Sequence, residues 1–308
     1  MGVNLTEASA GATTRPEWAQ RWMRPLAITT LAMNIAIVVS GGVVRLTSSG
    51  LGCPTWPRCT RESFVPHGEL GIHGAIEFGN RMVTFVLAAV AVATVFTAWR
   101  YGRRSVLRLA LVVAIGVPAQ GLIGGATVLT DLNPWIVAFH LLVSLAMIGV
   151  AVVLLRRLRE GDGAPLPTVP SPVAWLVRAT FATGWVVLYV GTVVTGSGPH
   201  AGDVDAPRNG LDPADVSQLH TDFVFLLIGL TVGALFALRS VGAPARAVRA
   251  AFVLLGLELA QGMVGFVQYV TDLPVVLVGL HLLGAALVSA ALTWLLLGVR
   301  DRPPFSRR

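Results

Sequence analysis

Eight apolar stretches limit what this chain can fold into. Each is close to the roughly 20 residues that an α-helix needs to cross the hydrocarbon core of a bilayer. The segments between them are short, which excludes a separate water-soluble catalytic domain. Because 54% of the residues are hydrophobic and only 13% are charged, the sequence predicts an all-α membrane protein with eight transmembrane helices. We expect these helices at about 26–45, 74–99, 109–130, 134–155, 173–196, 217–238, 250–271 and 274–297.

The 23 basic residues, all of them arginine, indicate how these helices are oriented. Most lie near the two termini or in the loops after the second, fourth and sixth stretches. By the positive-inside rule, these loops and both termini face the cytoplasm. The net charge of +7 is then a consequence of topology, so we expect no nucleic-acid partner and a multi-pass protein of the plasma membrane. The arginines concerned are Arg15, Arg21, Arg24, Arg100, Arg103, Arg104, Arg108, Arg156, Arg157, Arg159, Arg178, Arg239, Arg246, Arg249, Arg300, Arg302, Arg307 and Arg308.

An internal repeat divides the chain into two halves. The segment QGLIGGATVLTDLNPWIVAFHLL, which begins at Gln120, matches QGMVGFVQYVTDLPVVLVGLHLL, which begins at Gln261, without a gap. Each half then holds four helices, and an even number gives both halves the same orientation in the membrane. We therefore predict two pseudo-symmetric four-helix bundles. Residues 1–160 and 173–308 form the halves, and the proline-rich stretch 161–172 joins them.

Three histidines lie inside the predicted helices at one depth. His140, His220 and His281 each follow, by six or seven residues, a proline at the outer start of a span. At 1.5 Å per residue, all three lie about 10 Å below the outer helix ends. A single histidine in a membrane helix is often only a hydrogen-bonding group between helices, and this alternative stays open.

Aligning the second helices of the two halves pairs Asn80 with His220. The second half would then present His220 and His281 from two helices at equal depth, as the clamping of a metal porphyrin between two imidazoles requires. A zinc site is less suitable, because zinc takes three or four ligands. The first half offers His140 opposite Asn80.

Both cysteines, Cys53 and Cys59, fall in the first outer loop, LTSSGLGCPTWPRCT. The outer side of a membrane permits disulfides, and the short spacing lets the two thiols meet. Two free thiols are the alternative. A covalent c-type haem is excluded, because the sequence contains no CxxCH motif.

Several motifs together resemble one family, the haem A synthases of bacteria and mitochondria in their eight-helix form. They are VVRLTSSGLGCPTWPRC from Val43, IEFGNR from Ile76, the two QG…TDL…H segments, and VVTGSGPHAGD from Val193. The resemblance covers nearly the whole chain. It implies an oxidoreductase that converts a methyl group of haem O to a formyl group, which gives haem A for terminal oxidases. It also implies a b-type haem as cofactor, haem O as substrate, contact with membrane lipid, and a haem O synthase as a partner.

The resemblance also assigns roles to individual residues. His220 and His281 would be the axial ligands of haem b in the second half. His140 would face the substrate haem in the first half, and Glu77 would be the catalytic carboxylate. Cys53 and Cys59 would form the outer-loop disulfide.

One departure from the family pattern concerns the second helix. The family has E-x-x-H-R there, whereas this chain reads Glu77, Phe78, Gly79, Asn80, Arg81. Asparagine is a poor iron ligand, so either His140 holds the iron alone or His73, two turns away on the same helical face, replaces the missing ligand. We favour the open iron face, because a substrate must enter, react and leave.

The remaining polar residues allow more than one interpretation. Glu77 would accept a proton in the reaction, or it would only pair with Arg81 one helical turn away. Arg45 and Arg81 would bind haem propionates, although Arg45 could simply mark a helix end. A di-haem b cytochrome that transfers electrons without modifying haem is the alternative function. A transporter is less suitable, because the midplane shows no broken helices.

Overall fold

The computed structural model describes residues 16–303, so Arg15, Arg307 and Arg308 lie outside the described residues. Eight helices in this part are long and apolar enough to cross a membrane, which confirms the predicted all-α membrane fold. A short 3₁₀ helix, η1 (Gly68–Leu70), precedes the second helix. The eight helices are α1 (Glu17–Leu46), α2 (Gly71–Tyr101), α3 (Arg104–Leu129), α4 (Pro134–Arg157), α5 (Ser171–Ser197), α6 (Pro213–Ser240), α7 (Ala245–Val270) and α8 (Val275–Gly298).

Several helices extend beyond the apolar stretches that predict them. Helix α1 begins at Glu17, so Arg21 and Arg24 lie on its first turns, whereas we expected them to precede the helix. Ala19 and Met23 in these turns are fully buried, and Met23 packs in one apolar cluster with Ala98, Val106 and Leu154 of neighbouring helices. Hydropathy therefore locates the part of a helix within the hydrocarbon, while packing at the interface decides where the helix begins.

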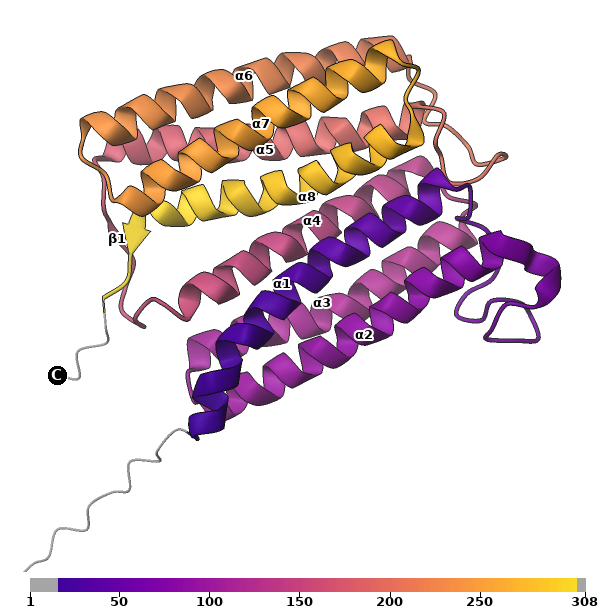
Figure 1. The fold of residues 1–308 in the computed structure, drawn as a ribbon, viewed down its shortest axis with the longest axis horizontal. Helices are drawn as coiled ribbons and strands as arrows, with labels where there is room; N and C mark the ends of the chain where they lie inside the picture. Colours follow the sequence, from indigo (N-terminus) through magenta and orange to yellow (C-terminus); the bar gives the residue numbers. More distant parts are fainter. Residues whose placement is uncertain (1–15, 304–308) are drawn as a thin grey trace, which may run out of the picture.

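Each half closes into a bundle in which consecutive helices are neighbours (Figure 1). In the first half, α1 and α3 each pack against both α2 and α4. In the second half, α5 and α7 each pack against both α6 and α8. Within residues 16–303, the diagonal pairs α2/α4 and α6/α8 make no extensive contact. The helices that carry Asn80 and His140, and those that carry His220 and His281, therefore face each other across the bundle centres.

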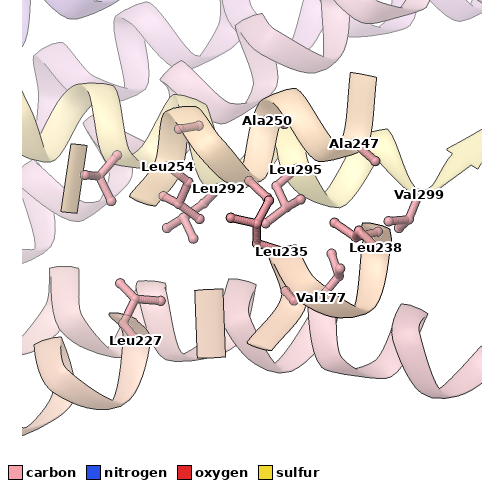
Figure 2. Close-up of a cluster of buried hydrophobic side chains, with 14 of the residues drawn as sticks. Val177, Leu227, Leu235, Leu238, Ala247, Ala250, Leu254, Leu292, Leu295 and Val299 are labelled. Carbon is pink, nitrogen blue, oxygen red and sulfur yellow. The ribbon is translucent and has the colours of Figure 1, made fainter. Parts of the chain in front are cut away.

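The two bundles meet through four helices. Helix α4 packs against α8, α1 packs against α8, and α5 packs against α4. Exchanging α1 with α5 and α4 with α8 leaves this set of contacts unchanged, as a two-fold relation requires. The Ser289 hydroxyl donates a buried hydrogen bond of 2.8 Å to the Leu145 carbonyl and so joins α8 to α4. The largest apolar core cluster crosses this interface and continues between α6, α7 and α8, where Figure 2 shows Leu235, Leu254 and Leu292.

The sequence repeat is also a repeat of local structure. Asp131 and Leu132 both have positive φ angles, of 50° and 59°, in the turn between α3 and α4. Asp272 and Leu273 have φ angles of 57° and 58° in the corresponding turn between α7 and α8. The same backbone turn therefore connects the last two helices of each half and fixes the same depth for the histidines that follow.

The segment between the halves is held against the end of the chain. Strand β1 (Leu166–Pro167) pairs antiparallel with strand β2 (Arg300–Asp301). Nearby, Arg103 forms two hydrogen bonds with the Asp162 carboxylate, of 2.9 and 3.1 Å, and Ser105 donates another. We call this end of the molecule the linker end, and the opposite end, with Cys53 and Cys59, the disulfide end. The sequence does not predict the two short strands, because their partners are far apart in the chain.

Candidate functional site

The three intramembrane histidines lie at equivalent heights near the disulfide end. His140 is the sixth residue after Pro134, the first residue of α4, and His220 is the seventh after Pro213 in α6. His281 is the sixth residue after Val275 in α8. They are therefore all within two turns of a helix start.

Each of these imidazoles lies against a glycine of a neighbouring helix. A Cβ atom at Gly124 of α3 would lie 3.3 Å from Cε1 of His140, and one at Gly265 of α7 would lie 3.4 Å from Cε1 of His281. A Cβ atom at Gly191 of α5 would lie 3.1 Å from Cε1 of His220. The helix backbone can approach the rings this closely because these positions have no side chain.

The histidine rings also carry unsatisfied nitrogen atoms. Nδ1 of His140, His220 and His281 is buried and has no hydrogen-bond partner among the described residues, although the Val187 carbonyl lies close to the His220 ring. The rings as a whole are only partly buried. Buried polar atoms without partners are uncommon, because they lose their water without compensation. Imidazoles in this state fit a bound ligand better than a role in holding helices together.

In the second half, the structure brings two of the histidines together. His220 and His281 approach from the diagonal helices α6 and α8, and they lie within electrostatic range of each other. Two imidazoles at one height on opposite walls of a four-helix bundle match the donor set of a porphyrin iron. Within residues 16–303, no group of three or more metal-binding side chains is present.

The first half differs at the position opposite His140. The Asn80 carboxamide oxygen accepts a hydrogen bond of 2.7 Å from the Ser40 hydroxyl of α1. His73 lies in the first turn of α2, where its Nδ1 is 3.0 Å from the Ser49 hydroxyl. It lines a cavity of about 410 Å³ at the disulfide end, together with Glu69 and Asp203. No residue of α4 lines this cavity, so the observed contacts of His73 are with loops and not with the His140 helix.

Glu77 is buried, with 5% of its surface exposed, and both of its oxygens are occupied. Oε2 accepts a hydrogen bond of 2.6 Å from the backbone N–H of Cys53. Oε1 pairs with Arg81 at 2.6 Å, so the ion pair considered as an alternative role for Glu77 is present. Glu77 therefore joins α2 to the disulfide loop.

Arg81 also joins α2 to the loop that contains Cys53 and Cys59. Its guanidinium donates to the carbonyls of Cys53, Thr55, Pro57 and Arg58, at 3.1 to 3.4 Å. Because these donors already have partners in the structure, Arg81 is not free to bind a haem propionate as expected.

A disulfide joins Cys53 and Cys59, which confirms the predicted pairing. Both cysteines are fully buried. Within the same loop, Trp56 packs so closely on α3 that a Cβ atom at Gly125 would lie 2.4 Å from its ring. The loop thus closes over the first half of the molecule, where Glu77 and Arg81 hold it.

Arg45 has a different environment. At the end of α1, it donates to the carbonyls of His200 and Thr195 in the second half, at 2.5 and 2.8 Å. Arg208 lies close enough to interact with it electrostatically. Neither arginine forms an ion pair with any described carboxylate. Sequence reasoning missed Arg208, although an arginine in an acidic outer loop is an exception to the distribution of the other arginines.

Comparison with known proteins identifies one family model and several relatives that match part of the chain. A family model described as "Cytochrome oxidase assembly protein" (COX15-CtaA) matches residues 24–74 and 70–204. A protein of Halalkalibacterium halodurans named Heme A synthase is 32% identical over 175 residues, which cover 54% of this chain and 57% of the relative. A Heme A synthase of Lysinibacillus sphaericus is 31% identical over 180 residues, which cover 56% and 58%. One of Bacillus cereus is 25% identical over 207 residues, which cover 65% and 66%.

The chain therefore matches little more than half the length of the first two of these relatives. The family match includes Cys53, Glu77 and His140, while His220 and His281 lie beyond it. Because the matched region runs from residue 24 to residue 204 of 308 residues, it covers more than half of the chain, and the chain belongs to the COX15-CtaA family of cytochrome oxidase assembly proteins.

Proposed function

We propose that this protein is a haem A synthase, an oxidoreductase that converts a methyl group of haem O to a formyl group. The relatives named Heme A synthase support the reaction. The observation that carries the proposal is an asymmetry between two equivalent bundles. In the second half, both diagonal helices, α6 and α8, carry a histidine. In the first half, α4 carries His140, whereas the opposite helix α2 carries Asn80 and, one turn before it, the carboxylate Glu77.

In the second half, comprising residues 173–308, His220 and His281 would hold haem b. The unpartnered Nδ1 atom of His281 and the common height of the two imidazoles support this assignment. Bound there, haem b would supply a one-electron carrier. Gly191 and Gly265 would keep the helix backbones close to the two imidazoles and limit their movement.

In the first half, comprising residues 1–160, His140 would face haem O. Asn80, whose carboxamide oxygen accepts a hydrogen bond from Ser40, would not bind the iron of haem O. Haem O, held by His140 alone, could then enter and leave as a substrate must. Glu77 would accept a proton from the reacting methyl or hydroxymethyl group. This role requires the carboxylate to release Cys53 or Arg81, its two partners in the structure.

The propionates of a bound haem would meet guanidinium groups at the disulfide end. Arg45, Arg208 and Arg81 all donate to backbone carbonyls, but only Arg81 also pairs with a described carboxylate, that of Glu77, so Arg45 and Arg208 keep more of their charge available for this contact. We further propose that the disulfide end faces outward and that both termini lie in the cytoplasm of a cell bounded by the plasma membrane. A haem O synthase in the same membrane would supply the substrate.

A di-haem b cytochrome that only transfers electrons would be expected to carry two equivalent ligand sets. The replacement of the expected histidine by Asn80 in one half argues against this alternative.

A pair of variants tests whether Glu77 acts chemically. Glu77→Gln removes the basic group and weakens the pair with Arg81, whereas Arg81→Gln weakens that pair and keeps the carboxylate. We expect Glu77→Gln to stop the conversion of haem O, with haem b content retained, and Arg81→Gln to keep a substantial rate. The measurement is the haem composition after incubation with haem O, separated by chromatography. Equal loss in both variants would show that Glu77 only anchors the loop, and full conversion by Glu77→Gln would exclude a chemical role.

A further inference from the structure

A second buried carboxylate lies in the membrane interior of the second half. Glu258 of α7 is only 4% exposed. Its Oε1 accepts a hydrogen bond of 2.8 Å from the Thr231 hydroxyl of α6. Its Oε2 is buried and has no partner among the described residues. A carboxylate in this environment is costly as an anion, so its presence needs an explanation.

Among residues 16–303, no charged side chain compensates Glu258. The helices packed against α7 carry Asp215, His220, Asp222 and Arg239 on α6 and His281 on α8. Helix α7 itself carries Arg246, Arg249 and Tyr269. None of these groups interacts electrostatically with Glu258, whose one polar partner is the Thr231 hydroxyl. The carboxyl group is therefore free to exchange a proton without breaking an ion pair.

The first half shows that the fold does not need this polar pair. The repeat places Val117 at the position of Glu258, and the alignment of α2 with α6 places Ala91 at the position of Thr231. Ala91 and Val117 are both buried and belong to one apolar cluster with Leu87. The equivalent helix pairs thus pack differently: α2 and α3 pack through alkyl groups, whereas α6 and α7 pack through a hydroxyl and a carboxyl group. Packing alone would favour the alkyl pair.

Glu258 lies below the histidines on the bundle-facing side of its helix. It precedes Gly265 by seven residues, which is two turns on the same face and about 10 Å along the helix. Gly265 is the glycine against which the His281 ring lies. A charge at this distance, in a medium without mobile water, acts on the His220 and His281 site more strongly than a surface charge would.

We propose that Glu258 is a proton-binding site that takes up a proton when the second half of the molecule accepts an electron. The inference rests on the proposed haem b between His220 and His281. One electron from the oxidised substrate, or from a chemical reductant, enters the second half, and one proton passes from water to the Glu258 carboxylate. The charge of the membrane interior is then unchanged, which lowers the electrostatic cost of adding the electron.

The test is a redox titration of the purified full-length protein, followed by the haem b absorption spectrum, between pH 6 and pH 9.5. In the wild type, the reduction equilibrium constant should fall as the pH rises, because the Glu258 anion favours the oxidised state. Glu258→Gln stays neutral and should keep a higher constant at alkaline pH, by up to about tenfold, which is 59 mV for one electron. At acidic pH the two proteins should agree.

Two further variants separate Glu258 from other titrating groups. Asp215→Asn removes an exposed carboxylate from the first turn of α6 and should leave the pH profile unchanged. Thr231→Val removes the one donor to Glu258 and should retain the pH dependence but move it to higher pH. If Glu258→Gln does not fold, the infrared difference spectrum of the wild type and Thr231→Val decides, since reduction should produce a carboxylic acid band that shifts in the variant.

The outcomes distinguish this inference from the proposed function. Haem b with the same pH profile in wild type and Glu258→Gln would overturn the proton site and leave the haem assignment intact. Absence of a carboxylic acid band on reduction would do the same. A wild-type protein that binds no haem b would instead overturn the proposed function.

Discussion

The glycine beside each histidine is the feature that most sharply defines the site at the scale of single residues. Gly191 leaves the least room, because a Cβ atom there would lie 3.1 Å from the His220 ring. A Cβ atom at Gly262 of α7 would have nothing within 4 Å. The two glycines therefore offer a matched pair for testing whether close approach to the ring matters.

We predict that Gly191→Val displaces His220 and lowers the haem b content of the purified protein several-fold, in the same direction as His220→Ala. Crowding of this kind typically costs about 1–3 kcal/mol, because the ring or the backbone must move. Gly262→Val should retain the wild-type content, as should His140→Ala. The ratio of haem absorbance to protein measures the effect. Equal haem content in Gly191→Val and the wild type would contradict the assignment of His220.

The sequence singled out His140, His220 and His281 as candidate ligands and predicted the disulfide, but it did not predict the hydrogen-bond partners of Glu77 and Arg81. Histidine and cysteine stand out because their side chains are rare in apolar helices. The partner of Glu77 is a backbone N–H at Cys53, which depends on how an irregular loop folds back, and no side-chain pattern records that. The expected propionate contact of Arg81 was therefore an inference from charge alone.

At the scale of elements, glutamine side chains join neighbouring helices at the height of the histidines. Gln120 of α3 donates to the His140 carbonyl at 3.1 Å, and Gln261 of α7 donates to the His281 carbonyl at 2.8 Å. Gln120 also donates to the Ser144 hydroxyl. These bonds fix α4 against α3 and α8 against α7, the helices that supply the glycines beside the His140 and His281 rings.

The Arg103–Asp162 contact secures the segment between the halves, and it is sensitive to acid. The Arg103 guanidinium and the Ser105 hydroxyl lower the pKa of Asp162 from 3.8 to about 2. The stabilisation is therefore complete above pH 4 and is lost as the pH falls through about 2. We predict that Asp162→Asn lowers stability by about 1 kcal/mol or less at pH 5, since the carboxylate is partly exposed.

The measurement is thermal unfolding in detergent between pH 5 and pH 2. The difference between Asp162→Asn and the wild type should close as the pH approaches 2. A difference that stays constant over this range would show that the Asp162 charge does not hold the segment.

At the scale of the whole molecule, two similar bundles with different ligand sets are the basis of the proposed division of labour. The repeat predicted the two bundles, because corresponding segments fold alike in corresponding surroundings. The contrast between Thr231–Glu258 and Ala91–Val117 became visible only when the structure showed that the first pair is hydrogen-bonded and that the second belongs to one apolar cluster. The two residues of each pair lie far apart in the sequence, so a pattern within one segment of the sequence does not reveal that they belong together.

Extraction of the pigments from the purified full-length protein, produced together with a haem O synthase, tests the central proposal most directly. Chromatography and mass spectrometry of the extract should show haem b together with haem A or a hydroxylated intermediate on the way to it. Haem b alone, in protein that was supplied with haem O, would contradict the proposal and favour an electron-transferring cytochrome.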